Sequence, residues 1–326
     1  MPSFGRDVVT LLSSTLTRIC VPAFFILSGF LFFQNQNKLS LQTYKNKLHR
    51  RFYTLLIPYV LWNIISLILE ILKIRYLGFP NHGLFENGGI NWIKVIEGFF
   101  NYVDGYPFAF AFWFIRNLMG FVILSPVVYF IGCKKLSIGI IFIMACCVMD
   151  TILWGFTFFV IGGILARYFY NFMFRVHFLP SLACGIVWFG IAILNVNIQY
   201  DYLSSTILII ESISALVFII SLLGIYKKKL KDSLILKIAP AMFFIYSFHQ
   251  LFCSIVRNFY INIFGLDTSI GIILSYLFSF VTMVGFSYVI WLTLKSICPS
   301  ILNILCGNRG KNSFNVNSVN KLMSIH

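Results

Sequence analysis

Long apolar runs alternate with short polar segments along most of the chain. Crossing a hydrocarbon core of about 30 Å takes about 20 helical residues. Only helices and closed β-barrels can span lipid, because the backbone must satisfy its own hydrogen bonds there. None of the runs shows the strict alternation of a barrel strand, so we expect helices. The pattern therefore predicts an all-α polytopic membrane protein with about nine transmembrane helices, at 18–34, 54–77, 110–131, 138–150, 154–174, 178–197, 205–226, 238–264 and 268–297.

Composition supports this class. Hydrophobic residues make up 59% of the 326 and charged residues 11%, too apolar for the surface of a soluble domain. A net charge of +15 would suggest a nucleic-acid partner in a soluble protein. In a membrane protein the location of the charged residues matters more than the net charge, so we expect membrane lipids and no nucleic acid as partners.

The eight cysteines form no CxxC or Cys/His cluster, so we expect no metal site and no disulfide.

Loop charge predicts the orientation. Most of the 25 Lys and Arg residues fall in 35–53, 132–137, 167–177, 227–237 and after 295, whereas the acidic segment 78–109 alternates with these. Basic loops stay in the cytoplasm, so we expect 78–109 outside, with a short helix near 91–101, and a cytoplasmic C-terminus. Residues 1–297 read as one membrane domain, and the Asn- and Ser-rich 298–326 as a disordered tail.

The first run, "RICVPAFFILSGFLFF", carries a proline and two small residues. Pro22 should loosen the helix, while Ser28 and Gly29 should let another helix approach closely. In this orientation a segment of about 17 residues must lie outside with no signal peptide before it. We therefore expect that a preceding span is missing from the chain, and that this absent span is the neighbour of Ser28 and Gly29.

Charged residues at membrane depth are the next candidates, because each costs roughly 2.5–3.5 kcal/mol to insert. Four of them lie about six or seven residues from the outer end of their runs, which at 1.5 Å per residue places them in one layer. They form an ion-pair layer, or they reach outward to the membrane surface, or they line a polar cavity that receives a hydrophilic substrate from outside. These four are Glu70, Arg116, Glu211 and Arg257.

Two further features each allow two interpretations. His249 lies deepest, in "FFIYSFHQLF", and either hydrogen-bonds across helices or serves a functional site. Lys47, Arg50 and Arg51 share one helical face, where their charges repel one another. They either anchor the chain to lipid headgroups or bind the phosphates of a nucleotide-like donor.

Five pieces of the chain, in order over residues 5–295, resemble the bacterial integral-membrane acyltransferases of the acyltransferase-3 family. "VPAFFILSGFLFF" resembles the signature of the family's second span. "KNKLHRRFYTLLIPYVLW" resembles the basic stretch leading into the next span. The other three are "FAFWFIRNLMGFVILSPVVY", "FTFFVIGGILARY" and "FFIYSFHQLF".

The resemblance implies about ten spans with both termini cytoplasmic. It also implies O-acyl transfer from cytoplasmic acyl-CoA, commonly acetyl-CoA, to sugars of surface glycans or lipid-linked acceptors in the bacterial inner membrane. No cofactor is bound, and acyl-CoA is a co-substrate. The family's first span carries a catalytic Arg and His, and no His precedes His49 here. The catalytic residue is therefore unknown, with His249 as a candidate, and we expect the chain alone to be inactive.

The resemblance also assigns roles to the polar residues already named. Lys47, Arg50 and Arg51 would bind the phosphates of CoA. The tunnel or acceptor side would be lined by Ser28, Glu70, Trp113, Arg116, Glu211, Tyr246, His249 and Arg257. Two alternatives stay open: a transporter or flippase of a lipid-linked sugar, and a degenerate, inactive homologue. A transporter would often show inverted repeats and broken helices, and the sequence shows no internal repeat.

Overall fold

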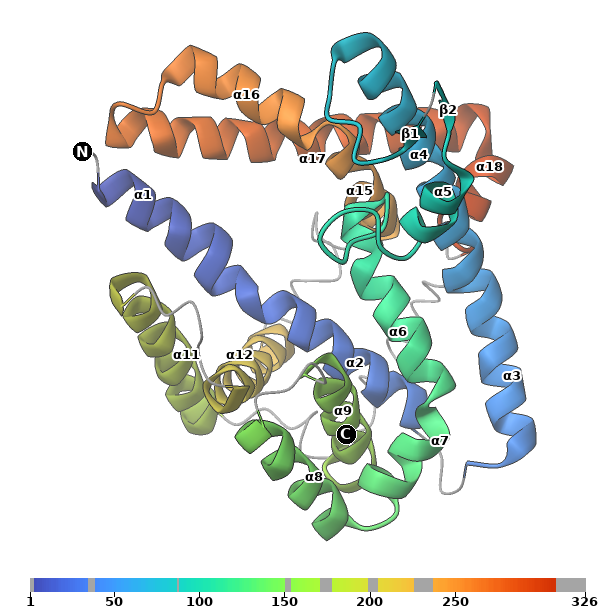
Figure 1. Cartoon of the computed structure of the whole chain (residues 1–326). Coiled ribbons are helices and arrows are strands. Elements are labelled where there is room, and N and C mark those ends of the chain that lie inside the picture. Colours follow the sequence, from blue (N-terminus) through green and yellow to red (C-terminus); the bar gives the residue numbers. More distant parts are fainter. Residues whose placement is uncertain are drawn as a thin grey trace. The chain divides into compact units, whose positions relative to one another are not determined.

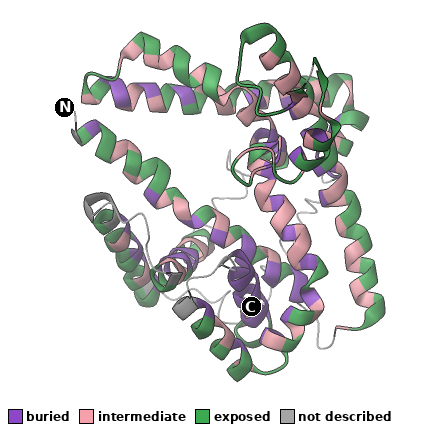
Figure 2. Cartoon of the chain, in the orientation of Figure 1, coloured by how far each residue is buried: buried purple, intermediate pink, exposed green. Residues whose placement is uncertain are grey.

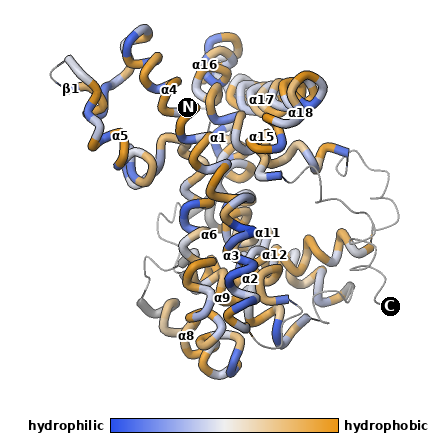
Figure 3. Tube along the Cα trace, turned by 90° about the vertical axis from the view of Figure 1, so that its right-hand side faces the viewer, coloured by the Kyte–Doolittle hydropathy of each residue, from blue (hydrophilic) through white to orange (hydrophobic). Residues whose placement is uncertain are grey.

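The computed structural model describes residues 3–34, 39–86, 88–149, 154–170, 178–198, 205–225 and 237–308. Helices account for nearly all of these residues, and the described strands are two short ones, β1 (Phe85–Glu86) and β2 (Gly89–Ile90). Figure 3 shows hydrophobic residues over most of the helices. The prediction of an all-α polytopic membrane fold is confirmed.

Each predicted run contains apolar helix, although the helices differ in length. Within the described residues four are long and apolar enough to span a membrane, or up to six if each bent pair is one span. The bent pairs are Phe110–Ile123 with Ser125–Cys133, at 65°, and Ala239–Leu251 with Cys253–Phe264, at 67°. Three predicted runs contain shorter apolar helices: Leu136–Cys146, Gly155–Tyr168 and Leu179–Leu194. The presence of nine transmembrane helices therefore stays a prediction.

The chain divides into two compact units, each assembled from segments far apart in the sequence (Figure 1). Unit 1 contains residues 1–44, 120–233 and 265–273, and unit 2 contains residues 45–119, 234–264 and 274–326. The boundaries predicted from sequence, with one domain over 1–297, stay a prediction, and the two units are described separately.

Unit 1 is built around the packing of α2 (Cys20–Phe33) against α9 (Trp154–Tyr168). Figure 2 shows α9 as the most continuously buried helix of this unit. Phe25, Phe32 and Phe159 are almost completely buried between the two helices and their neighbours. The surrounding helices are α1 (Ser3–Thr10), α7 (Ser125–Val128), α8 (Leu136–Met149), α11 (Phe178–Ile198) and α12 (Ser205–Ile225).

Two glycines let α2 and α9 touch at their backbones. A Cβ on Gly29 would lie 2.2 Å from the Phe159 carbonyl oxygen, and one on Gly162 would lie 2.1 Å from the Ile26 carbonyl oxygen. The contact therefore exists only because both positions lack a side chain. The prediction that Gly29 permits a close helix neighbour is confirmed, but the expected neighbour was wrong: it is α9, not a span preceding residue 18.

Irregular helix precedes Pro22, as expected. The first helical stretch begins at Ser3 and passes through a π segment (Leu11–Thr15) and a 3₁₀ segment (Leu16–Ile19) before α2. Pro22 has no N–H for the Arg18 carbonyl, so regular α-helical bonding is lost at this point. Phe4–Phe33 counts as a single 30-residue candidate span, so the 17 residues predicted to lie outside are part of a helix.

Unit 2 has an aromatic core around α4 (Ile57–Leu77). Tyr59, Trp62, Phe112 and Phe244 are buried there in ring contacts. α4 continues α3 (Leu41–Arg51) through a π segment, Phe52–Leu56, just before Pro58. The unit also contains α5 (Trp92–Gly98), a 3₁₀ turn (Phe110–Phe112), α15 (Met242–Phe248), a 3₁₀ turn (His249–Leu251), α16 (Cys253–Phe264) and α18 (Pro299–Leu305). It includes residues 113–119 of α6 (Trp113–Ile123) and residues 274–297 of α17 (Ser269–Ile297).

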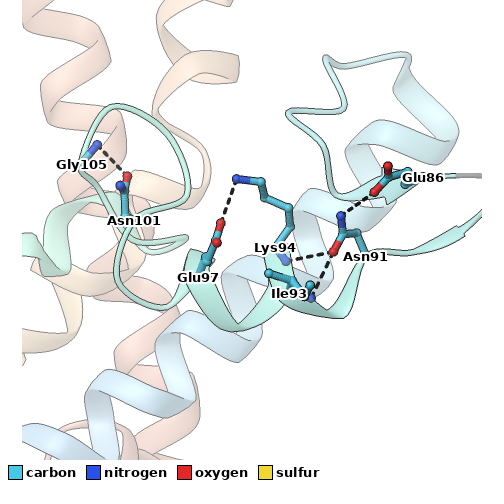
Figure 4. Close-up of polar contacts among 7 residues, drawn as sticks. All are labelled: Glu86, Asn91, Ile93, Lys94, Glu97, Asn101 and Gly105. Atoms are coloured by element: carbon cyan, nitrogen blue, oxygen red, sulfur yellow. Dashed lines mark hydrogen bonds and ion pairs between the residues drawn. The ribbon is translucent and has the colours of Figure 1, made fainter.

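The segment 78–109, predicted to be an outer loop with a short helix, has its own structure. β1 and β2 form an antiparallel hairpin, and α5 confirms the short helix. Asn91 caps α5: its Oδ1 accepts from the Ile93 and Lys94 N–H groups, and its Nδ2 donates to Glu86 (Figure 4). Lys94 and Glu97 form an ion pair at 2.8 Å.

The C-terminal segment packs on the first turns of α4. Trp62 Nε1 donates to the Leu305 carbonyl at 3.1 Å. Gly307 has a φ of +67° and lies against the Thr54 carbonyl. A Cβ on Gly307 would lie 2.5 Å from the Thr54 carbonyl oxygen. The region predicted as a disordered tail from residue 298 thus begins with helix α18, and residues 309–326 lie outside the described part.

Candidate functional site

The predicted site residues are divided between the two units. Ser28 and Glu211 belong to unit 1, and the others to unit 2. Ser28 is half-buried on α2 beside Gly29. Within unit 2, Tyr246 contacts the turn before Trp113 at the start of α6, and Arg116 lies one turn further along that helix.

The start of α6 is held by side chains from two other helices. Tyr246 on α15 donates its hydroxyl to the Ala111 carbonyl, and Gln250 Oε1 accepts from the Ala111 N–H at 2.6 Å. Asn63, completely buried on α4, accepts from the Ala109 N–H at 3.1 Å. These contacts fix the turn that leads into Trp113, which is half-buried at the first position of α6.

Asn63 and Gln250 were missed by the sequence reasoning. Both are uncharged amides inside apolar runs, and that reasoning weighed charged side chains and histidine. A side-chain amide in an apolar run needs hydrogen-bond partners in the same way as a charge does. Applying the criterion to every polar residue at membrane depth would have found both.

Arg116 binds backbone carbonyls rather than carboxylates. Its Nη1 donates to the carbonyls of Phe100 and Gly105, the latter at 2.9 Å, and its Nε donates to Asn117 Oδ1 at 3.2 Å. Glu70 pairs instead with Lys73 at 3.6 Å, one turn away on α4. Arg257 is exposed on α16. Among the described residues of unit 2 no ion pair joins Glu70, Arg116 and Arg257. The layer of four charged residues, whether paired or lining a polar cavity, stays a prediction.

Glu211 is completely buried on α12, and neither carboxylate oxygen has a hydrogen-bond partner among the described residues. Arg18, in the 3₁₀ segment before α2, interacts with it electrostatically without forming an ion pair. The structure therefore places Glu211 with Arg18 in unit 1.

His249 is oriented by its own helix. Its Nδ1 lies 2.8 Å from the Ile245 carbonyl oxygen, which can only accept, so Nδ1 carries the hydrogen. In the neutral ring this leaves Nε2 as the nitrogen that accepts a proton. His249 stands at the start of the 3₁₀ turn that precedes the bend at Phe252.

Lys47, Arg50 and Arg51 end helix α3, on the polar side of the apolar run. Burial, and then the charges of Arg51 and Arg50, lower the pKa of Lys47 to about 8. Burial and the charge of Arg50 also lower the pKa of Arg51. Among the described residues no carboxylate forms an ion pair with Arg50 or Arg51. The cluster therefore carries positive charge that an anion would stabilise.

Cysteine and metal chemistry add nothing to this picture. In the part of the chain that the structure describes, seven cysteines form no disulfide, and no three His, Cys, Asp or Glu side chains gather in a group that could hold a metal.

Comparison with known proteins gives one match. The family model described as an acyltransferase domain matches residues 2–292, which is most of the chain. No curated protein and no solved structure matches. A match over this length includes the cation cluster, Arg116, Tyr246 and His249. The chain therefore belongs to the acyltransferase-3 family of membrane acyltransferases.

Proposed function

We propose that this protein transfers an acyl group, acetyl in the simplest case, from cytoplasmic acyl-CoA to a hydroxyl of a surface or exopolysaccharide sugar. It would do so in the bacterial cytoplasmic membrane, with its C-terminus in the cytoplasm. Membership of the family supports acyl transfer by a multi-pass protein. Loop charge supports the orientation.

The cation cluster at the end of α3 is the observation that carries the donor assignment. CoA bears a diphosphate and a ribose phosphate, and guanidinium groups bind such oxygens through paired, charge-assisted hydrogen bonds. A phosphate group would relieve the repulsion that, with burial, lowers the pKa of Lys47. Lys47, Arg50 and Arg51 are therefore proposed as the CoA-binding residues.

The chemistry requires a base and a leaving group. The sugar hydroxyl attacks the thioester carbonyl, a C–O bond forms as the C–S bond breaks, and CoA leaves as the thiolate. The base takes the hydroxyl proton and returns it to the thiolate sulfur. The sequence predicted an inactive chain because the family's catalytic Arg and His are absent; we propose instead that His249 serves as the base, because its Nδ1–H bond to Ile245 fixes the ring with Nε2 as the proton acceptor.

The acceptor side is assigned to polar residues near the start of α6. Trp113, Arg116 and Tyr246 gather there, and Glu70 lies on α4 in the same unit. Ser28, Glu211 and Arg257 stay weaker candidates, because none of the described contacts joins them to this group. Indole and tyrosine rings suit a sugar, whose C–H face packs on aromatic surface while its hydroxyls bond to polar groups.

A donor-binding experiment tests the proposal. CoA is titrated into the purified protein in detergent, and its affinity is compared between the parent and the Arg50→Ala/Arg51→Ala variant. Each lost contact with a phosphate should weaken binding by roughly tenfold or more, since hydrogen bonds to charged groups contribute about 1.5–3 kcal/mol. A phosphate-free thioester, S-acetylpantetheine, should bind both proteins equally.

Lys45→Ala is the matched control. Lys45 belongs to the same helix and carries the same charge as Lys47, but by the 3.6-residue period it lies on the opposite face. It should leave CoA affinity unchanged. Equal CoA affinity in the parent and the double-arginine variant would contradict the donor assignment and favour a lipid-headgroup anchor.

Transport of a lipid-linked sugar is a second candidate. It is favoured by the two bent helix pairs, at 65° and 67°, because broken helices often form transporter binding sites. Protein reconstituted in vesicles distinguishes the two. An acyltransferase consumes acetyl-CoA and releases CoA when a sugar acceptor is supplied, whereas a transporter moves the lipid-linked sugar without acetyl-CoA.

A further inference from the structure

The segment 92–111 lies beside the start of an apolar helix rather than beyond its outer end. Tyr59 donates its hydroxyl to the Phe99 carbonyl, and Asn63 accepts from the Ala109 N–H. Tyr59 and Asn63 belong to the first two turns of α4, whereas Leu77 ends that helix. At 1.5 Å per residue, Tyr59 is about 27 Å from Leu77, which approaches the thickness of the hydrocarbon core. The chain leaves α4 at Leu77 and therefore returns along most of its length.

The irregular backbone of this segment is satisfied by protein side chains. Arg116 donates to the carbonyls of Phe100 and Gly105, and Asn101 Oδ1 accepts from the Gly105 N–H at 2.9 Å (Figure 4). Asn91 caps α5, and Tyr246 and Gln250 hold Ala111. Non-helical backbone within a bilayer is tolerated only where protein supplies such partners or it lines a water-filled cavity.

One side of α5 is apolar and uncovered. Trp92, Ile93, Ile96 and Phe100 are 68%, 70%, 68% and 59% exposed. Trp92, Ile93 and Ile96 belong to α5 and at 100° per residue lie within an arc of about 100°, and Phe100 follows two residues after the helix. Val95 and Gly98 are buried on the other side, and the Phe108 ring would lie 2.2 Å from a Cβ on Gly98. The arc is as wide as the apolar stripe by which a helix normally packs into a core.

Lipid chains are the occupant that fits this arc. α4 exposes its own apolar stripe every fourth residue, at Val60, Ile64, Ile68 and Leu72, as a helix facing lipid would. The whole connection 78–109, to which α5 belongs, joins apolar helix at both ends, at Leu77 and Phe110, which keeps α5 near the bilayer. The segment 92–111 carries three charges: Lys94 and Glu97 pair with each other at 2.8 Å, which lowers the cost of placing them near lipid, and Asp104 is exposed in the turn between Val103 and Tyr106.

We propose that residues 92–111 form a membrane-embedded element, with Trp92, Ile93, Ile96 and Phe100 in contact with lipid acyl chains. Arg116 then has a structural role at membrane depth: it supplies the hydrogen bonds that the carbonyls of the element cannot obtain from water.

Fluorescence quenching of Trp92 tests this. The full chain is reconstituted in bilayers of ordinary lipid or of lipid brominated on its acyl chains, and the signal of a Trp92→Phe variant is subtracted from that of the parent. The conservative replacement keeps the apolar arc. We expect the difference signal to lose most of its intensity in brominated lipid, and to keep it when iodide is added to the water.

Two other outcomes would overturn the proposal. Quenching by iodide but not by bromine would place Trp92 in water. Quenching by neither would mean that protein, such as a second copy of this chain, covers the arc. Trp62, which is 2% exposed, provides the matched control, because the Trp62→Phe difference signal should respond to neither quencher. The result is independent of CoA binding, so it stands or falls separately from the proposed function.

Discussion

Replacing Gly29 by alanine should weaken the contact between α2 and α9 in unit 1. The new Cβ would lie 2.2 Å from the Phe159 carbonyl oxygen, whereas ordinary contacts begin at 3.4 Å. The helices must therefore separate locally by more than 1 Å, since a backbone oxygen cannot turn aside as a side chain can. Gly162→Ala should act in the same way, through the Ile26 carbonyl oxygen 2.1 Å away.

The size of the effect follows from two opposing terms. Overpacking a well-packed contact costs about 1–3 kcal/mol. Exchanging glycine for alanine inside a helix recovers about 0.5–1 kcal/mol. We therefore expect each variant to be less stable by about 1–2 kcal/mol. Because both glycines serve one contact, the double variant should lose less than the sum of the two.

Thermal unfolding of the purified protein in detergent measures this, with two helical glycines as controls. Nothing lies within 4 Å of a Cβ on Gly120 or on Gly190, so alanine at either position keeps only the favourable helix term. Their midpoints should equal or exceed that of the parent. A Gly29→Ala variant as stable as these controls would refute the backbone contact between α2 and α9.

Two further predictions concern the proposed chemistry. The pKa of Lys47, lowered to about 8, means that the side chain is charged below that pH and neutral above it, so CoA affinity should fall about tenfold from pH 7 to pH 9. Titrations of the Lys47→Arg variant should lack this pH dependence, and a parent profile as flat as that of the variant would contradict the role of Lys47. His249→Gln should bind CoA normally yet lower the rate of acetyl transfer by about 10²–10⁴-fold, the usual contribution of a general base. Unchanged transfer, measured as CoA release, would exclude His249 as the base.

Much of the fold follows from the sequence because lipid restricts what the chain can do. Apolar runs must become helices, and each predicted run contains one. Irregular helix at Pro22 was predictable because proline removes a backbone donor. The bend at Phe252 was not, because no proline or glycine marks it. Tertiary contacts such as the one between Gln250 and Ala111 hold that region, and a single sequence does not display them.

The candidate site was predicted less well than the fold. Distance from the end of a run placed Glu70, Arg116, Glu211 and Arg257 in one layer, although depth alone does not say which way a side chain points. Arg116 turns to loop carbonyls, and Glu70 pairs with Lys73 within its own helix. The partner of Gly29 could not be read from the sequence either, because a small residue indicates a close approach without identifying what approaches.

The packing of the C-terminal segment on α4 bears on how this protein can be handled. Trp62 holds the Leu305 carbonyl, and Gly307 sits against the Thr54 carbonyl. Thr54 follows Arg51 by three residues, so this segment braces the helix that presents the cation cluster. Purification tags and fluorescent reporters are therefore best fused after residue 308. A truncation before Pro299 would remove the brace and is expected to reduce expression and CoA binding together.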